Sequence, residues 1–272
     1  MGDNPITLEA HDVNDNIALK KFVAIRKNPA GEEEYIPAKA KNFLFVVSVD
    51  DYEYWPKLNN AVKDANDLVS ILMSKYQFEF NQLTILKNEQ ATRANIYKSL
   101  RSLIEKITPQ DNLLIYYSGH GYFDNLLNEG YWIPVEAKPL SVGDYISNAD
   151  ILKLVENINS QHTFLVADAC FSGALFASSK RGYTDNVEKF KSRWGLASGR
   201  LEVVSDGVIG ENSPFAKAFI AYLKENDRTK FAVSELIQFI KLKVSEVSEQ
   251  TPIGSPLLVE GDEGGEFVFY IR

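Results

Sequence analysis

The sequence predicts an α/β protein with a mostly parallel central sheet that helices cover on both faces. Short apolar runs rich in Phe, Val, Leu and Ile alternate with longer segments in which apolar residues recur at helical spacing. The runs are apolar through their middles, as expected for strands that are buried on both faces. Regular alternation of strand and helix requires crossover connections, which place helices against a parallel sheet.

The elements follow one another from residue 42 onward. The apolar runs predict strands at residues 42–49, 82–87, 111–118 and 163–167, and a terminal strand at 266–271. Apolar residues at helical spacing predict helices at residues 58–72, 96–107, 151–158, 213–224 and 233–247. Thr92 is expected to cap the second helix, and Ser147, followed three residues later by Asp150, is expected to cap the third.

Residues 1–41 differ from the rest of the chain. They are polar and irregular, and they contain Pro5, Pro29 and the acidic run 32–34. We interpret residues 1–41 as an N-terminal extension or linker. Residues 42–272 are then one domain, long enough to bury a substantial core.

Charge and composition argue against several classes of partner. The chain has 29 Lys and Arg against 37 Asp and Glu, a net charge of −8. This disfavours nucleic acid, whose binding needs clustered positive charge. No apolar run approaches about 18–20 residues, so no membrane span is expected. The first residues lack the basic start and apolar stretch of a secretory signal, which favours a cytoplasmic location.

The chain has a single cysteine, Cys170. One cysteine excludes an intramolecular disulfide framework and any multi-cysteine zinc site. The acidic pair Asp50–Asp51 and Asp144 lack the spacing of an EF-hand, so we expect solvated loop charges there and no metal site.

Reactive side chains follow two of the predicted strands. Strand 111–118 runs into Gly119-His120-Gly121, and strand 163–167 is followed directly by Asp168-Ala169-Cys170. The carboxyl ends of parallel strands meet at one edge of a sheet, where binding sites form. A thiol is nucleophilic as the thiolate, and a nearby histidine can take its proton. The flanking glycines allow backbone N–H groups to approach a substrate carbonyl closely.

The two motifs, SGHG at 118–121 and DACFSG at 168–173, resemble those of the caspase-like cysteine peptidases. These form the caspase/metacaspase clan, peptidase family C14, and the bacterial orthocaspase and metacaspase-like members look closest. LNNAVKDANDL at 58–68 resembles the family's first helix, YWIPVEA at 131–137 its post-histidine hairpin, and residues 212–216 and 264–269 its small subunit. The resemblance implies a caspase-like three-layer α/β/α sandwich. Its large-subunit-like part would be 42–176, its linker loop 177–194 and its small-subunit-like part 195–272.

The resemblance also implies a mechanism for cleaving protein or peptide substrates. Cys170 would attack the peptide carbonyl, His120 would manage the protons, and a thioester intermediate would form. The N–H groups of Gly121 and Cys170 would make the oxyanion hole. No cofactor would be required, and calcium activation, which occurs in some metacaspases, has no support in this sequence.

The residue two positions before the cysteine predicts the substrate preference. Animal caspases carry Gln there, whereas this chain carries Asp168, the metacaspase pattern. Asp64 occupies the position at which metacaspases supply a second pocket carboxylate. Two carboxylates in a partly closed pocket favour Arg, or else Lys, through charge-assisted hydrogen bonds, and they repel Asp. The resemblance therefore implies cleavage after basic residues.

Two alternatives remain open at this stage. The polar, basic segment 177–194 is either a plain surface loop or an intersubunit linker that the protein itself cuts at Lys180, Arg181, Lys191 or Arg193. The whole chain is either a peptidase or a catalytically silent scaffold, and a peptidase could work as an effector module with a regulatory partner or inside a larger complex.

Overall fold

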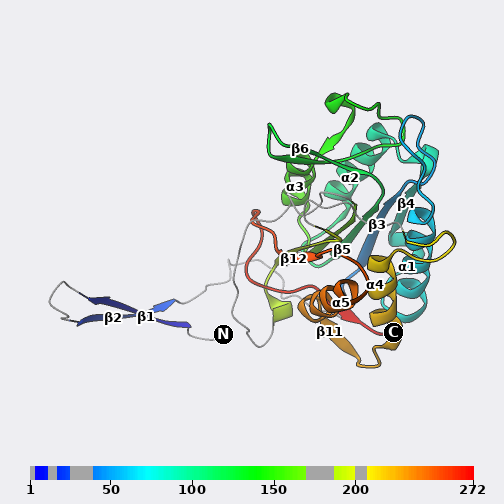
Figure 1. Ribbon diagram of the computed structural model, residues 1–272. Coiled ribbons are helices and arrows are strands. Elements are labelled where there is room, and N and C mark those ends of the chain that lie inside the picture. The colour runs from blue at the N-terminus through cyan, green and yellow to red at the C-terminus, as the bar shows by residue number, and fades with distance from the viewer. Residues whose placement is uncertain (1–3, 12–16, 25–38, 170–186, 200–206) are drawn as a thin grey trace. The chain divides into compact units, whose positions relative to one another are not determined.

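Within the described part of the chain, six strands form the central sheet of the computed structural model (Figure 1). In spatial order they are β12 (Ile253–Pro256), β10 (Ser192–Ala197), β9 (His162–Asp168), β5 (Asn112–Ser118), β3 (Asn42–Ser48) and β4 (Leu83–Lys87). The structure describes residues 4–11, 17–24, 39–169, 187–199 and 207–272. All pairings in this sheet are parallel except that of β12 with β10. The prediction of a mostly parallel sheet is confirmed.

Helices cover both faces of the sheet (Figure 1). One face packs against α1 (Ala61–Lys75), α4 (Pro214–Glu225) and α5 (Val233–Val247), and the other against α2 (Arg93–Lys106) and α3 (Asn148–Asn157). Alternate residues of β3 point to opposite faces: Leu44 and Val46 join the first core, and Phe45 and Val47 join the second. The three-layer α/β/α arrangement is confirmed.

The described residues also form three small antiparallel sheets. β6 (Gly121–Asp124), β7 (Glu129–Trp132) and β8 (Ile146–Ser147) form one small sheet that begins directly after His120. β11 (Lys230–Ala232) pairs with β13 (Val268–Tyr270), the terminal strand that the sequence predicts. β1 (Asn4–His11) and β2 (Ile17–Ala24) form a hairpin in a separate unit, residues 1–34, while residues 35–272 form the other unit.

Three helices begin at side-chain caps. The Thr92 hydroxyl accepts the N–H of Asn95 at 3.2 Å, and the Ser147 hydroxyl accepts that of Asp150 at 3.0 Å, as the sequence predicts. Ser213 caps α4 in the same way, and Pro214 occupies the first helical position, where its missing N–H costs no hydrogen bond. These caps fix where the chain turns at the edges of the sheet.

The predicted linker 177–194 is wrong at its C-terminal end. Residues 192–194 belong to β10 in the central sheet, and Arg193 is only 2% exposed. Its guanidinium donates hydrogen bonds to the backbone carbonyls of Ser192, Ser160, Ile158 and Gln161, at 2.8 to 3.4 Å. Because neighbouring carbonyls accept hydrogen bonds from its two terminal nitrogens, a residue that looks like part of a surface loop is buried within a strand.

Candidate active site

The register of the central strands brings the two motifs together. β5 and β9 pair in parallel with Ser118 opposite Asp168, so both chains leave the sheet at the same edge. The N–H of Gly119 donates to the carbonyl of Asp168 at 3.3 Å, which ties the two exits to each other. Cys170 lies outside the described residues and follows Ala169, which is buried beside this bond. His120 therefore lies two residues beyond the end of β5, and β5 adjoins β9, the strand that leads to Cys170.

The imidazole of His120 is oriented by a backbone carbonyl. Its Nε2 lies 2.7 Å from the carbonyl oxygen of Pro56. A carbonyl oxygen can only accept a hydrogen bond, so Nε2 carries the proton. In the neutral ring the lone pair is then on Nδ1, the atom able to take a proton from a nucleophile.

The backbone and ring of His120 are held by neighbouring aromatic side chains. Its N–H donates to the hydroxyl of Tyr52 at 2.7 Å, and its carbonyl accepts the hydroxyl of Tyr117 at 2.5 Å. The ring centroid lies 4.8 Å from that of Tyr52 and 5.5 Å from that of Trp55. Tyr52, Trp55 and Pro56 all come from one loop after β3, so a single loop positions the histidine.

Gly119 is required by this packing. A Cβ atom there would lie 2.5 Å from the Tyr52 hydroxyl oxygen and 3.0 Å from that of Tyr117. Burial also raises the pKa of Tyr52 well above its ordinary value, so its hydroxyl stays protonated. The glycine permits a close approach that any other residue would block.

The two predicted pocket carboxylates meet around one residue, Ser213. The Ser213 hydroxyl donates to Oδ2 of Asp168 at 2.8 Å. The backbone N–H of the same serine lies 3.2 and 3.3 Å from the two carboxylate oxygens of Asp64. The Asn212 side-chain amide adds a bond to Asp64 at 2.8 Å. The structure thus brings Asp64 and Asp168 together through the N-terminus of α4.

Both carboxylates are buried, Asp64 at 1% exposure and Asp168 at 6%. Burial and, after it, the negative charge of Asp168 raise the pKa of Asp64 to about 7. Asp64 is therefore partly protonated near neutral pH.

The segment before α4 is fastened to α1. The side chain of Asn60 donates to the carbonyl of Val208 at 3.0 Å and accepts the N–H of Gly210 at 3.1 Å. Asn212 bonds Asp67 as well as Asp64. These bonds fix the residues that lead into Ser213 against the helix that carries Asp64.

Comparison with known proteins decides the family. Residues 41–258 match the family model described as the caspase domain. The chain belongs to the caspase-domain family of cysteine peptidases. This membership confirms the resemblance to the caspase/metacaspase clan, while closeness to its bacterial members stays a prediction.

Curated relatives of this caspase domain are metacaspases. It is 21% identical to Metacaspase-1A of Aspergillus terreus, over 81% of this chain and 60% of that protein. It is 27% identical to Metacaspase-1 of Pyricularia oryzae, over 82% and 62% of the two chains. The domain thus spans about three-fifths of the length of these relatives. Among solved structures, protein GSU0716 from Geobacter sulfurreducens matches 80% of this chain and 93% of its own, with a TM-score of 0.60 and 15% identity, which shows a shared fold.

The remaining predicted site residues of the caspase domain fall into two groups. Gly121 is buried at the start of β6, next to His120, and its part in an oxyanion hole with Cys170 stays a prediction. Lys180 and Arg181 lie outside the described residues. Lys191 borders β10 and is partly exposed, whereas Arg193 lies inside that strand and is out of a protease's reach while the sheet is intact.

The sequence alone does not indicate these roles for Ser213 and Tyr52. A serine followed by proline at the start of an apolar helical pattern does indicate a helix cap. Nothing local indicates that the same serine also contacts two carboxylates, since these lie 45 and 149 residues away in the chain. Tyr52 likewise reaches His120 across 68 residues.

Metal-binding geometry is not found among the described residues of the caspase domain, where no group of three or more His, Cys, Asp or Glu side chains gathers. The acidic loop residues have other partners: Asp51 pairs with Lys57 at 2.7 Å, and Asp50 accepts the N–H of Val62. Asp144 accepts the N–H of Lys138. The same part of the chain contains no helix both long and apolar enough to span a bilayer.

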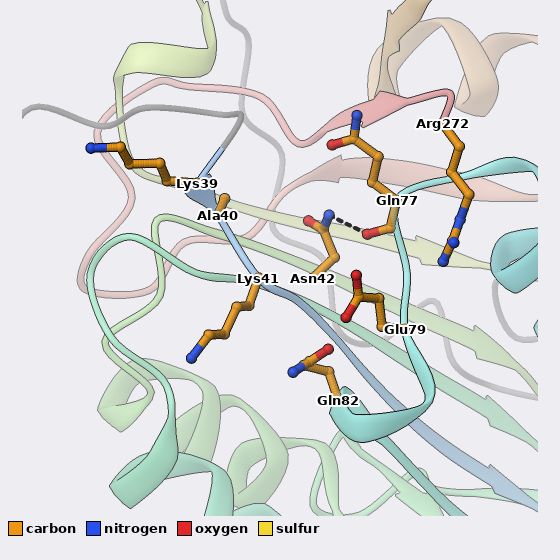
Figure 2. Close-up of a pocket in the computed structure, with 8 residues that line it drawn as sticks. All are labelled: Lys39, Ala40, Lys41, Asn42, Gln77, Glu79, Gln82 and Arg272. Carbon is orange, nitrogen blue, oxygen red and sulfur yellow. Dashed lines mark hydrogen bonds between the residues drawn. The ribbon is translucent and has the colours of Figure 1, made fainter.

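A separate cavity of about 430 Å³ lies near the amino end of β3 (Figure 2). Its lining includes Lys39, Lys41, Asn42, Gln77, Glu79 and Arg272. Asn42 is the first residue of β3, and its side chain donates to the carbonyl of Gln77 at 2.6 Å, the bond drawn in Figure 2. Since His120 follows the carboxyl end of the adjacent strand β5, this cavity belongs to the opposite edge of the sheet.

Proposed function

We propose that this caspase domain is a cysteine endopeptidase that cleaves peptide bonds after Arg and, less efficiently, after Lys. The observation that carries the proposal is the buried pair of Asp64 and Asp168 at the sheet edge that also carries His120. Such a pair attracts a guanidinium and repels an acidic side chain. The pair adjoins the residue that precedes the cysteine, so it suits the substrate side chain just before the bond to be cut.

The proposed reaction begins with the cysteine and the histidine. Nδ1 of His120 takes the proton of the Cys170 thiol, and the sulfur attacks the substrate carbonyl. The N–H groups of Gly121 and Cys170 bind the oxyanion that develops. His120 then gives the proton to the leaving amine, and a thioester remains on Cys170. Water, deprotonated by the same histidine, hydrolyses the thioester and restores the enzyme.

The bond from His120 Nε2 to Pro56 supports this sequence of steps. It selects the tautomer with a basic Nδ1, and it can persist when the ring becomes positively charged, because the carbonyl still accepts. The Pro56 carbonyl therefore stabilises the imidazolium that forms when the thiol is deprotonated.

The experiment compares matched peptides that carry Arg, Lys, Asp or citrulline, a neutral analogue of Arg, before the cleaved bond. We expect cleavage after Arg and Lys that is lost in Cys170→Ala and in His120→Ala. The citrulline peptide is expected to be cleaved about 30-fold or more less efficiently than the Arg peptide, since one desolvated charge pair contributes roughly 2–4 kcal/mol. Efficient cleavage after Asp would overturn the pocket assignment.

Thiol labelling separates an enzyme from a silent scaffold. Iodoacetamide is expected to alkylate Cys170 rapidly in the unmodified protein and much more slowly in His120→Ala, because only the thiolate reacts. Slow labelling that does not depend on His120 would instead support a scaffold without peptidase activity.

A further inference from the structure

Ser213 contacts both buried carboxylates through two different groups. Its hydroxyl donates to Asp168 and its backbone N–H donates to Asp64. Both carboxylates thus bond to groups of a single residue. The spacing and orientation of the carboxylate pair therefore depend on where this serine lies.

The direction of the Ser213 hydroxyl is fixed by its second role. As the cap of α4, its oxygen accepts the N–H of Ala216 at 3.0 Å. That bond uses a lone pair and leaves the hydroxyl proton for Asp168. The same atom thus anchors the helix and orients the aspartate, which a residue without a hydroxyl cannot do.

The donors recorded on Asp64 are neutral groups, the Ser213 N–H and the Asn212 amide. Asp168 likewise accepts a neutral hydroxyl from Ser213. Neutral donors stabilise a carboxylate without cancelling its charge, and the N-terminus of α4 adds a partial positive charge. These donors therefore leave the negative charge of the ionised carboxylates in place to attract a cation. A lysine or arginine in place of Ser213 would lose the cap and bring a positive charge that neutralises the pocket.

We infer that Ser213 is the positioning residue for guanidinium recognition: it holds Asp64 and Asp168 as an oriented anionic pair for the substrate's arginine. This inference takes its substrate from the proposed function. It means that the residue that caps α4 also determines the preference for arginine. Ser213 acts through the two aspartates and does not take part in the chemistry at Cys170.

The test uses three variants. Ser213→Ala removes the hydroxyl, Ser213→Thr retains it, and Ser147→Ala is the matched control. Ser147 caps α3 through the same kind of bond to the third residue on, at the same length of 3.0 Å as the Ser213 cap, so its loss reports the cost of a missing cap alone. Thermal unfolding of all three variants verifies that they are folded.

Three quantities are measured for each variant. They are kcat/KM on Arg and Lys peptides, the iodoacetamide labelling rate of Cys170, and the protection of that labelling by agmatine, a small guanidinium probe. We expect Ser213→Ala to lower kcat/KM for the Arg peptide about 10- to 100-fold, the cost of one hydrogen bond to a charged group. The agmatine concentration for half protection should rise by a similar factor, while labelling without agmatine stays within about 2-fold. Ser213→Thr should restore both values to within a few-fold, and Ser147→Ala should change neither.

Several outcomes would overturn the inference. Unchanged agmatine protection in Ser213→Ala would show that the serine does not orient the pair. If Ser147→Ala lowered kcat/KM and agmatine protection as much as Ser213→Ala does, Ser213 would be a structural cap only. The same would follow if labelling without agmatine fell by the same factor as cleavage. If the unmodified protein does not cleave after Arg but agmatine protects it in a Ser213-dependent way, the proposed function fails and this inference stands. If agmatine does not protect the unmodified protein, the inference itself fails.

Discussion

The hydroxyl of Tyr52 accepts the backbone N–H of His120 at 2.7 Å. The two residues lie 68 positions apart in the sequence, and the bond joins the loop after β3 to the end of β5. This bond fixes the position of the His120 backbone. The hydrogen bond from Nε2 to the Pro56 carbonyl fixes the orientation of the imidazole ring.

Tyr52→Phe should impair catalysis more than it impairs folding. The change leaves the His120 N–H without its acceptor, at a cost of about 1–3 kcal/mol for a buried donor, and it frees the histidine to shift. We expect kcat to fall about 10-fold or more on an Arg peptide, with KM little changed. Tyr54→Phe is the matched control, since Tyr54 is 52% exposed. Equal activities of the two variants would contradict the assignment.

Gly119→Ala should be far more damaging than Gly143→Ala. A Cβ at Gly119 would lie 2.5 Å from the Tyr52 hydroxyl oxygen, whereas a Cβ at Gly143 would meet no atom within 4 Å. Because Tyr52 is buried, its ring cannot simply swing away. We expect Gly119→Ala to lower both the melting temperature and the rate of Cys170 labelling. If Gly119→Ala were as stable and as reactive as Gly143→Ala, the loop that carries Tyr52 would be able to move away from the added Cβ, contrary to this prediction.

The pKa of Asp64 predicts a specific dependence of stability on pH. Its value rises from 3.8 to about 7 in the folded protein, so between these pH values the folded state binds a proton that the unfolded state has released. The free energy of unfolding therefore falls as the pH rises through this window and levels off above it. Between pH 5 and pH 8, the free energy of unfolding of the unmodified protein should fall by on the order of 2–3 kcal/mol more than that of Asp64→Asn.

Denaturant unfolding at several pH values measures this difference. Asp67→Asn is the control on the same helix, because hydrogen bonds from Lys63 and Asn212 lower the pKa of Asp67 despite its partial burial. A lowered carboxyl pKa gives stability that is lost at acid pH, below this window. Parallel pH profiles of the unmodified protein and Asp64→Asn would show that Asp64 titrates normally.

Arg193→Ala should destabilise the fold without changing any residue of the candidate active site. It removes a buried guanidinium that donates to four carbonyls, and those carbonyls lose their partners. We expect a loss of about 3 kcal/mol or more in the free energy of unfolding. The exposed Arg101→Ala should cost less than about 0.5 kcal/mol. Mass spectrometry of self-processed protein should show no fragment beginning at Trp194, and such a fragment from folded protein would contradict the burial of Arg193.

The parts of the fold that could be predicted are those set by local chemistry. β3, β5 and β9 are apolar on both faces, so their sequence alone distinguishes them from surface segments. The caps at Thr92 and Ser147 follow from hydrogen bonds within a single turn. Family membership could be recognised because the motifs around His120 and Cys170 are short and contiguous.

The parts that could not be predicted depend on distant partners. β10 contains Ser192, Arg193 and Gly195, and it is a strand because it pairs with β9 and β12. Arg193 can be buried there because carbonyls some 30 residues earlier accept its hydrogen bonds. β12 contains Gly254 and Pro256, which disfavour strands in isolation. The contacts of Ser213 and Tyr52 arise only when separate layers pack, and a local sequence pattern carries no information about them.

The distance of 149 residues between Asp64 and Ser213 has a consequence for how the protein is made. Synthesis delivers His120 and then Cys170 before the ribosome reaches Ser213. A nascent or truncated chain that stops between residues 170 and 213 thus contains the proposed nucleophile and its proposed base but lacks Ser213, which contacts both carboxylates. Pairings so far apart in the chain form late in folding. On the proposed roles, the residues for reactivity are synthesised early and the residue that arranges the pocket late, so the carboxylate pair is complete only after α4 docks on α1.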